Sequence, residues 1–338
     1  MNVPAKEYDG ENRYIRITDI DDCSHLYSLL NEVSPDGNLE DKYLVKEGDI
    51  LFARTGASVG KSYIYRSSDG KLYFAGFLIR AHVRCEYNPF FVFYQTLTSK
   101  YSKWVNIMSA RSGQPGINSQ EYASYQLSVP PMNEQKKLAD FLSLLDERIA
   151  LQSKLIDRLK SLMGGIIDKV TARTPNISIG ECLDCYSSTL QECETEEQGT
   201  YPVYGANGVC GYLDYATISA PAILIVKDGS GVGNVSYANG DCSVVGTLNY
   251  MQPKKDVSAK FLYFVLKRFN FQPYKTGMAI PHIYFKAYSK ARIFCPDYEE
   301  QTRMAATLSR IEDKIALEER LLCLLQEQKH YLLSAMFI

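Results

Sequence analysis

The sequence lacks the features that mark membrane proteins, secreted proteins and most hydrolases. No apolar run approaches the 18 residues of a membrane span, and no apolar segment follows a basic N-terminus. The four histidines, at positions 25, 82, 282 and 330, are far apart, and no acid–base pair recurs along the chain. We therefore expect a cytoplasmic protein that contacts no membrane and carries no catalytic residues.

Nine cysteines, an odd number spread over the chain, fit a reducing cytoplasm better than a disulfide framework. Cys182 and Cys185 are spaced like half of a zinc site, and Cys193 and Cys210 follow. The other spacings are irregular, and the first part of the chain has no such set. Ordinary thiols are the better interpretation, so we predict no metal site.

Two short motifs resemble catalytic signatures but lack essential parts. The string from Gly56 to Ser62 contains Gly-Lys-Ser, but a phosphate-binding loop needs a glycine in place of Thr55 and a helix afterwards. The segment Asn88–Phe91 is similar to an amino-methyltransferase motif, yet it has no second proline and no glycine-rich cofactor loop. The chain is therefore predicted not to be an enzyme and to bind no cofactor itself.

A long stretch, residues 130–167, occurs twice. A shift of 166 places Glu134-Gln135 on Glu300-Gln301, and several apolar residues recur with them. Each copy follows a proline and predicts one helix of roughly 35 residues, about 50 Å long. A single apolar stripe on such a helix needs a partner. Two unrelated amphipathic helices would not explain the shared residues, so we expect an antiparallel coiled-coil pair.

The apolar residues of both copies follow a heptad pattern, with Leu138 taken as position a. In the first copy the apolar positions are a (Leu138, Leu145, Leu159, Ile166), d (Phe141, Leu155, Leu162) and e (Leu142, Ile149, Ile156, Met163). The second copy keeps the phase, with Met304, Ile311, Leu325 and Leu332 at a and Leu308, Ile315 and Leu322 at e. The pattern predicts that positions a, d and e form the buried stripe of each helix.

A second repeat precedes each helix. Residues 50–61 run from an apolar strand into a glycine loop, and residues 222–234 do the same at a shift of 173. Strands are expected at 14–20 and 62–66, the one helix of the first domain at 90–104, and loop and strand at 108–130. The predicted fold class is α+β. Two similar mixed α/β recognition domains, 1–130 and 171–295, each precede a long helix, 131–170 and 296–338.

The net charge of −2 hides an uneven distribution. Residues 1–49 hold five Lys/Arg against twelve Asp/Glu, a balance of −7, and residues 50–130 hold nine against three, a balance of +6. In the second half, residues 171–200 hold one against six (−5) and residues 201–295 ten against four (+6). Chance could produce one such block, but the repetition favours a phosphate-binding face in each domain.

The residues suited to DNA are cations and amides near the glycine loops. Lysine and arginine contact phosphates, and glutamine and asparagine pair with adenine. The candidates in the first domain are Arg54, Lys61, Arg66, Arg80, Arg84, Arg111, Ser112, Gln114 and Asn118, with Tyr63, Tyr65, Tyr73 and Trp104 among them. The candidates in the second domain are Lys227, Asn234, Lys254, Lys255, Lys275, His282 and Lys286. At each position, an ordinary solvated residue is the alternative.

These features together resemble the specificity subunit of type I restriction–modification systems. The resemblance rests on GDILFARTGASVGKS at 48–62, SGQPGINSQEYASYQLSVPPMNEQ at 112–135, CPDYEEQ at 295–301, and the long helix after each cycle. It covers nearly the whole chain. The arrangement of two recognition domains and two long helices is specific to that family.

The resemblance implies a role in defence against foreign DNA. Each domain would read one half of a bipartite double-stranded DNA site in the major groove, and the helices would set the gap between the halves. The implied partners are two modification subunits, which methylate adenine, and restriction subunits, which act as motor and nuclease. S-adenosylmethionine, ATP and magnesium would be bound by these partners only.

One departure from the family pattern concerns the first domain. In the second domain, Asn176–Leu183 forms the usual opening of a recognition domain, about 20 residues before Tyr201. The first domain starts almost directly at Tyr14, so we expect it to be abbreviated or to lack a preceding segment. Two alternative functions stay open: a protein-interaction scaffold that does not bind DNA, such as an orphan or truncated copy, and an enzyme with activity of its own.

Overall fold

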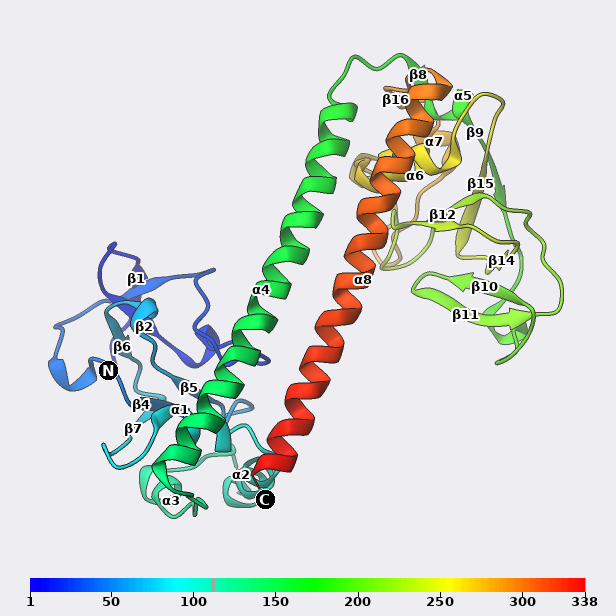
Figure 1. Cartoon of the computed structure of the whole chain (residues 1–338). Helices are drawn as coiled ribbons and strands as arrows, with labels where there is room; N and C mark the ends of the chain where they lie inside the picture. Colours follow the sequence, from blue (N-terminus) through cyan, green and yellow to red (C-terminus); the bar gives the residue numbers. More distant parts are fainter. Residues whose placement is uncertain (111–112, 338) are drawn as a thin grey trace. The chain divides into compact units, whose positions relative to one another are not determined.

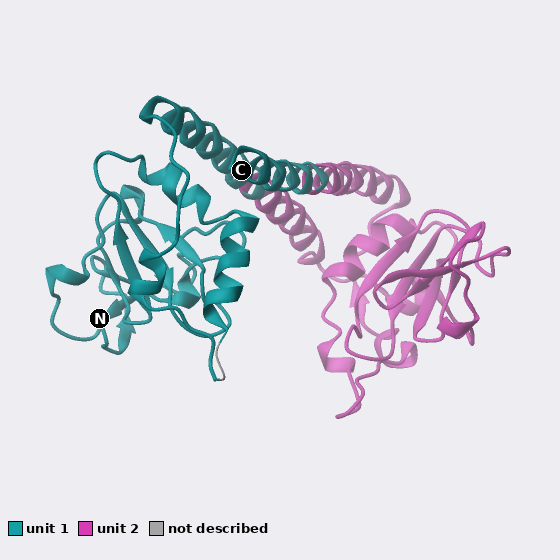
Figure 2. Cartoon of the chain, turned by 90° about the horizontal axis from the view of Figure 1, so that it is seen from below, with its two compact units in different colours: residues 1–153, 320–338 teal, residues 154–319 magenta. Residues whose placement is uncertain are grey.

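The computed structural model describes residues 1–110 and 113–337. Its contacts divide the chain into unit 1, Met1–Ser153 with Arg320–Ile338, and unit 2, Lys154–Glu319 (Figure 2). Helices α4 (Met132–Thr171) and α8 (Tyr298–Met336) therefore each contribute to both units. Among the described residues, no helix has the length and apolar character needed to cross a membrane.

Unit 1 is built on three small sheets. The strands are β1 (Ala5–Glu7), β2 (Arg13–Ile15), β3 (Val33–Pro35), β4 (Asp49–Ala53), β5 (Ser62–Ile64), β6 (Leu72–Phe74) and β7 (Leu78–His82). Strand β4 lies between β5 and β7 in an antiparallel sheet, β2 pairs with β6 in parallel, and β1 pairs with β3. All five residues of β4 are buried, because one face meets the aromatic helices and the other meets the β2–β6 layer.

The helices of unit 1 differ from the sequence prediction. The single helix expected at 90–104 is wrong: α1 (Pro89–Gln95) and α2 (Ser99–Ser109) are separate. The break occurs because the Thr98 hydroxyl accepts a hydrogen bond from the Tyr101 amide and so starts a new helix. The region 108–130 was expected to be loop and strand; its described residues are mostly loop, but a short helix, α3 (Ser119–Ala123) with Asn118 as its N-cap, stands in place of the strand.

Unit 2 repeats this layout with additional strands. Its elements are β8 (Ile177–Ser178), α5 (Ile179–Cys182), β9 (Leu183–Ser187), β10 (Tyr201–Gly205), β11 (Gly208–Leu213), β12 (Ala222–Val226), β13 (Val235–Ala238), β14 (Ser243–Val244), β15 (Leu248–Pro253), α6 (Ala259–Arg268), α7 (Phe285–Tyr288) and β16 (Arg292–Ile293). The main sheet has the order β13-β12-β15-β9, and a second sheet has the order β11-β10-β14. The apolar run of α6 packs on β12 and β13 in the largest core cluster.

The two units share a three-stranded antiparallel sheet and a parallel strand pair. The β13-β12-β15 sheet matches β5-β4-β7, and the parallel pair β10–β14 matches β2–β6. In each unit an amide just after the parallel pair bonds back to it, Ala75 N to Ile15 O and Val245 N to Tyr204 O, both at 3.0 Å. Strand β9 adds an edge beside β15, whereas β7 has no second partner strand among the described residues.

Each long helix is attached to its own domain by a buried glutamine. Gln135 accepts from the Asn88 amide at 2.9 Å and donates to the Pro130 carbonyl at 2.8 Å. Gln301, at the same place in the repeat, accepts from Ser258 at 2.8 Å and donates to Pro296 at 2.8 Å. Asn88 and Ser258 are the N-caps of α1 and α6, so the repeated glutamine joins equivalent helices in both units.

Within each unit, α4 and α8 run in opposite directions (Figure 1). In unit 1, Asp146 pairs with Lys329 at 2.6 Å, and Leu142 shares a core cluster with Leu333. In unit 2, Lys160 pairs with Glu319 at 2.7 Å, and Arg173, just beyond α4, pairs with Glu300 at 3.0 Å. In both units, residues with higher numbers on α4 contact residues with lower numbers on α8, so the two helices are antiparallel.

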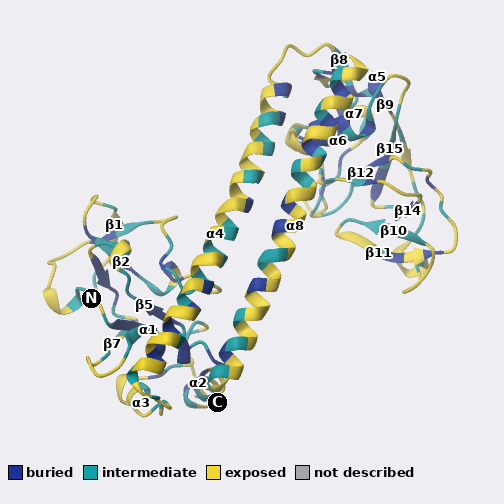
Figure 3. Ribbon diagram, viewed as in Figure 1, coloured by how far each residue is buried: buried dark blue, intermediate teal, exposed yellow. Residues whose placement is uncertain are grey.

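The predicted buried stripe is wrong at its d positions. Phe141, Leu155 and Leu162 are 48%, 40% and 53% exposed, whereas Ala139 and Ile167, outside the predicted stripe, are 2% exposed. Buried, intermediate and exposed positions alternate along both long helices (Figure 3). On α4, the buried face consists of heptad positions e, a and b instead of e, a and d. It is shifted because each helix packs against its own domain as well as against the other helix.

Candidate nucleic-acid interface

The glycine loops are tight β-hairpin loops in both units. Gly56, Gly60, Gly229 and Gly233 all have positive φ, between 77° and 96°. The Gly60 amide bonds to Ala53 O at 3.0 Å, and the Gly233 amide bonds to Val226 O at 2.9 Å. Strands β5 and β13 follow the loops, so no helix N-terminus is present there to hold a phosphate. The predicted glycine turn leading into a strand is confirmed in both units.

A second loop lies against each glycine loop. In unit 1, the Gly56 amide bonds to Pro115 O at 3.0 Å and the Ile117 amide to Arg54 O at 2.9 Å. In unit 2, the Gly229 amide bonds to Pro281 O at 2.9 Å and the Ile283 amide to Lys227 O at 2.9 Å. We name these second segments the return loops, residues 113–118 and 276–284. Both units thus present a cation, Arg54 or Lys227, beside the same pair of loops.

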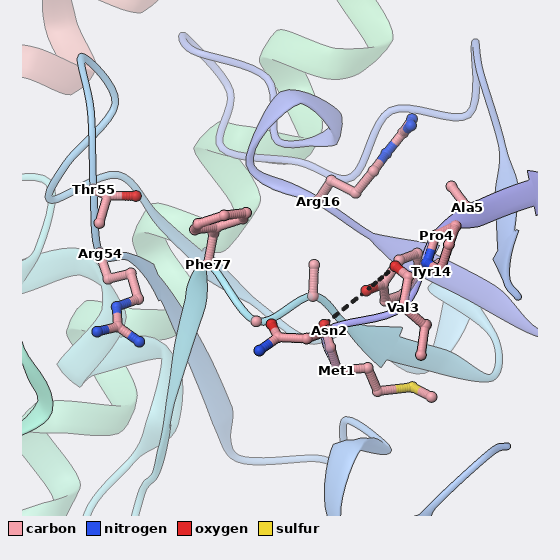
Figure 4. Close-up of a pocket in the computed structure, with 12 residues that line it drawn as sticks. Met1, Asn2, Val3, Pro4, Ala5, Tyr14, Arg16, Arg54, Thr55 and Phe77 are labelled. Atoms are coloured by element: carbon pink, nitrogen blue, oxygen red, sulfur yellow. Dashed lines mark hydrogen bonds between the residues drawn. The ribbon is translucent and has the colours of Figure 1, made fainter. Parts of the chain in front are cut away.

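Unit 1 places Arg54 at a hollow of about 740 Å³. Arg54, Thr55, Phe77 and Arg16 line it, and the Arg54 amide bonds to Phe77 O at 3.1 Å. In the view of Figure 4, the Phe77 ring lies between the two arginine side chains. Arg16 is held by Asp19 through two hydrogen bonds of 2.8 Å, whereas Arg54 is exposed. Arg54 is therefore the cation best placed to meet a phosphate here.

Unit 2 has a hollow of about 580 Å³ at the equivalent place. Each of the two hollows lies beside a glycine whose amide donates a hydrogen bond to a carbonyl earlier in the chain. Gly76 N donates to Met1 O at 2.6 Å, and Gly246 N donates to Leu190 O at 2.8 Å. The second hollow contains no lysine or arginine among its lining residues, and Thr247 takes the place of Phe77. The fold is repeated, but the side chains that line the two hollows differ.

Three other predicted cations of unit 1 are engaged within the domain. The Lys61 ammonium donates to Ile20 O at 2.5 Å and contacts Asp22 at 2.5 Å, leaving 10% of the side chain exposed. The Arg66 guanidinium lies over the Phe90 ring at 5.8 Å, with one buried nitrogen unpaired among the described atoms. The Arg80 guanidinium donates to Leu44 O at 3.0 Å. Reaching a phosphate would require these contacts to break, so we leave these residues out of the proposed interface.

Of the two amide side chains predicted in unit 1, one is exposed and one is used within the domain. Gln114 is exposed, and its amide nitrogen lies near Gly56, 3.3 Å from where a β-carbon would be. The Asn118 side chain accepts from the amides of Gln120 and Glu121, so it serves as the cap of α3. Arg84 is exposed on the loop after β7. The predictions for Arg111 and Ser112 lie outside the described residues.

Unit 2 brings only part of its predicted set together. Lys227 and His282 lie on the paired loops with Lys275 and Lys286 close in sequence, and Asn234 is exposed after the glycine loop. The Lys227 ammonium is paired with Asp228 at 2.5 Å. Lys254 instead contacts Gly180 O at 2.8 Å and Asp184 at 3.4 Å, near α5, and Lys255 is exposed beside it.

The aromatic residues proposed as groove readers are largely structural. Tyr63 and Tyr73 are 0% and 3% exposed, so they belong to the core. The glycine loop of unit 1 is held from below by two other tyrosines: Tyr101 donates to Gly60 O at 2.9 Å, and Tyr122 donates to Ala53 O at 2.7 Å. Burial raises the pKa of Tyr122 to about 12, so both hydroxyls stay protonated donors.

Sequence reasoning missed the exposed apolar residues of this region. Phe77 is 64% exposed, and in the unit 2 return loop Met278 and Ile280 are 106% and 68% exposed. The signal available was the repeat itself, since the segments Ala75–Leu78 and Val245–Leu248 occupy equivalent places.

The cysteines form no recognised site. Cys182 is buried, Cys185 and Cys210 are half-buried, and Cys193 is exposed. Within residues 1–110 and 113–337, no group of three or more histidine, cysteine or acidic side chains could hold a metal ion.

Comparison with known proteins addresses the family. The model described as "Type I restriction modification DNA specificity domain" matches this chain twice, at residues 5–161 and 178–327. The chain belongs to the type I restriction–modification specificity family. Both matches contain a glycine loop and its return loop, so the repeat found in the sequence is the repeat of the family domain.

Known members of the specificity family are distant in sequence. The EcoprrI specificity subunit of Escherichia coli is 24% identical over 117 residues, 35% of this chain and 29% of its own. A Mycoplasma pneumoniae protein named "Putative type I specificity subunit" is 23% identical over 228 residues, 63% of this chain and 61% of its own. The matched part is therefore less than two thirds of the length of either relative.

Solved structures establish the same fold. The S subunit of a type I restriction–modification system from M. genitalium superposes with a TM-score of 0.67 at 17% identity, over 98% of this chain and 89% of that one. A structure concerned with complex assembly and conformational transition of the type I system gives 0.53 at 16% identity, over 95% and 90%. The predicted fold class, two mixed α/β domains each followed by a long helix, is confirmed.

Proposed function

We propose that this chain is the DNA-recognition subunit of a type I restriction–modification complex, in which each unit reads one half of a bipartite site. The observation that carries the proposal is the loop pair built twice, with Arg54 and Lys227 at the same backbone position. A duplicated reading site on one chain suits a target with two separate halves. The charge balance of +6 in each loop-bearing segment supplies the attraction to phosphate.

Salt-dependent binding tests this proposal. The chain assembled with its modification subunits should bind duplex DNA with a steep inverse dependence on salt, of slope about −0.9 per phosphate contacted. Arg54→Ala should weaken binding and reduce that slope by about one contact. Lys169→Ala, which removes an exposed lysine of α4 far from both loops in sequence, is the matched control and should leave the slope unchanged.

A pure protein-interaction scaffold would give a different result. It would bind the modification subunits normally, and its affinity for duplex would be weak and equal in the wild type and Arg54→Ala. Methylation without site preference by the assembled enzyme would also contradict a reading role. These outcomes separate recognition of DNA from assembly alone.

The long helices are proposed to set the gap between the half-sites and to dock the modification subunits. Support comes from apolar side chains that neither unit buries. On the unit 1 portions of the helices these are Phe141, Leu144, Leu151 and Leu324; on the unit 2 portions they are Leu155, Leu162 and Leu317, each at least 40% exposed. An apolar face of this size suits a partner with an apolar surface of its own.

Substitution of one residue on this face tests the docking role. Leu162→Asp should reduce the fraction of chain that copurifies with modification subunits, because a carboxylate would enter an apolar contact. Asp157→Asn, on an exposed position of the same helix segment, is the control and should copurify like the wild type. Equal copurification of both variants would remove the helices from the docking surface.

The chemistry of modification and cleavage is proposed to belong to the partners. S-adenosylmethionine would then be bound by the modification subunits, with ATP and magnesium bound by the restriction subunits. Support comes from the family match, since both repeats of this chain match the DNA specificity domain. Methylation or cleavage of DNA by the isolated chain would refute this part of the proposal.

A further inference from the structure

The return loop of unit 2 ends in an apolar tip. Thr276 and His282 exchange two backbone hydrogen bonds, of 2.8 and 2.9 Å, and close a short hairpin. Its tip carries Met278 and Ile280, 106% and 68% exposed, with exposed Ala279 between them. Gly277 has a φ of 88°, and a β-carbon there would lie 2.3 Å from Ile280 O, so the turn requires glycine.

The hairpin is fixed to the glycine loop and has two lysines close to it in the sequence. Pro281 O accepts from Gly229 N and Lys227 O accepts from Ile283 N, which hold the base of the hairpin against the loop. Lys275 and Lys286 flank it and form no ion pair within the described part of the chain. An anionic surface is therefore drawn toward a tip that is itself apolar.

The same position in unit 1 carries an amide. Pro115 and Pro281 make equivalent bonds to the glycine loops, so the residues before them, Gln114 and Ile280, correspond. Both side chains are exposed. The two units thus present one backbone arrangement with opposite chemistry, a hydrogen-bonding amide in unit 1 and a branched alkyl group in unit 2.

This contrast restricts what the unit 2 tip can recognise. Among Met278, Ala279 and Ile280 no side chain is a hydrogen-bond donor, and the only acceptor is the weak thioether sulfur of Met278. Among the groups displayed in the major groove, the C5 methyl of thymine is the apolar one. A glutamine at the corresponding position can instead form two hydrogen bonds with adenine.

We infer that the hairpin tip of unit 2 reads thymine through its C5 methyl group, with Ile280 as the specificity-determining residue and Met278 beside it. Gln114 is its counterpart in unit 1 and reads adenine. This inference rests on the proposed function and names the base chemistry that each loop selects. The lysines around the hairpin contact phosphates and place the tip without reading sequence.

The test begins with the chain assembled with its modification subunits. Selection from a random duplex library gives the bipartite site, and each thymine in it is then replaced by deoxyuridine, which removes only the C5 methyl. One half-site should contain a thymine whose replacement weakens binding about fourfold, the effect of one buried methyl group. Ile280→Ala should bind deoxyuridine and thymine equally at that position.

A reciprocal exchange provides the specificity control. Ile280→Gln should shift the preference at that position from thymine toward adenine, and Gln114→Ile should shift the other half-site from adenine toward thymine. Both residues are exposed, so the variants should fold normally, and equal melting temperatures will check this. Each exchange should leave the other half-site unchanged.

The outcomes separate this inference from the function on which it rests. If no site is selected at all, recognition of DNA itself is refuted. If a site is selected but no thymine responds to deoxyuridine, or the response persists in Ile280→Ala, the role of the tip is refuted while recognition stands. A tip acting as a wedge between base steps would give that second result.

Discussion

Replacement of Gln135 by alanine should destabilise unit 1 by about 2–6 kcal/mol. The side chain is 2% exposed and satisfies two backbone groups, the Asn88 amide and the Pro130 carbonyl. Removal leaves both groups buried without a partner, at a cost of about 1–3 kcal/mol each. Gln301 makes the same two contacts in unit 2, so Gln301→Ala should have an effect of similar size.

Chemical denaturation and hydrogen exchange measure this effect together. In Gln135→Ala, exchange should accelerate in α1, whose N-cap amide loses its acceptor, while α6 keeps its protection. In Gln301→Ala the pattern should be reversed. Gln120→Ala, on an exposed position of α3, is the control and should change the free energy of unfolding by less than about 0.5 kcal/mol.

Gln135→Met separates hydrogen bonding from packing. Methionine fills nearly the same volume but cannot satisfy either backbone group, so it should lose almost as much stability as alanine. If methionine restored wild-type stability, the glutamine would act by filling space. If alanine itself cost less than about 0.5 kcal/mol, the attachment of the helix to its domain would have to lie elsewhere.

Three further predictions concern charge, backbone and length. Glu312→Gln should lower the free energy of unfolding by about 1–2 kcal/mol above pH 5. Burial opposes the charged form of Glu312, but a tyrosine hydroxyl and two lysines outweigh it and lower its pKa, so the stability of the wild type falls toward that of the variant as the pH falls through the lowered pKa in unfolding titrations. Glu319, in an exposed ion pair, is the control, and Glu319→Gln should be near neutral. Gly60→Ala should destabilise more than Gly10→Ala in thermal melts, because both have positive φ but only at Gly60 would the methyl meet Val105, at 2.5 Å; equal losses would mean that backbone strain alone matters. Insertion of seven residues into both long helices should lengthen the selected gap between half-sites by up to about 3 base pairs, from 1.5 Å per residue against about 34 Å per turn of duplex; an unchanged gap would contradict the spacing role.

The repeats could be found in the sequence because the residues that recur are structural. Gln135 and Gln301 recur because each makes the same pair of backbone bonds, and Leu142 and Leu308 recur because both are buried. The glycines of the loops recur because the hairpin needs positive φ there. Such requirements are local, so a single sequence displays them.

The buried face of the helices could not be derived from periodicity. A stripe at a, d and e shows that the helix has an apolar side, but its d edge is exposed at Phe141. Its other edge extends to Ala139, which is buried. Which edge is covered depends on where α1 and α6 lie, and those contacts join residues far apart in the sequence.

In the candidate site, too, residue type predicted some features and only the fold decided the others. Arg54 and Gln114 were predicted from residue type, and only the fold reveals that they share one loop pair. Lys61 was predicted on the same grounds, but the fold buries its ammonium against Ile20 and Asp22. The exposed tip at Ile280 was not predicted, because an isolated apolar residue in a sequence is usually a core residue.

The sequence by itself determined the double repeat, the two long helices, the hairpin form of the glycine loops and the family resemblance, because each depends on residues close in the chain or at a constant shift. Only the tertiary structure decided which cations are free to meet a phosphate, which helix edge is covered and which side chains stand beside the paired loops. The physical reason is that burial and ion pairing are set by neighbours in space. Those neighbours are brought together by backbone hydrogen bonds between segments that are distant in the sequence.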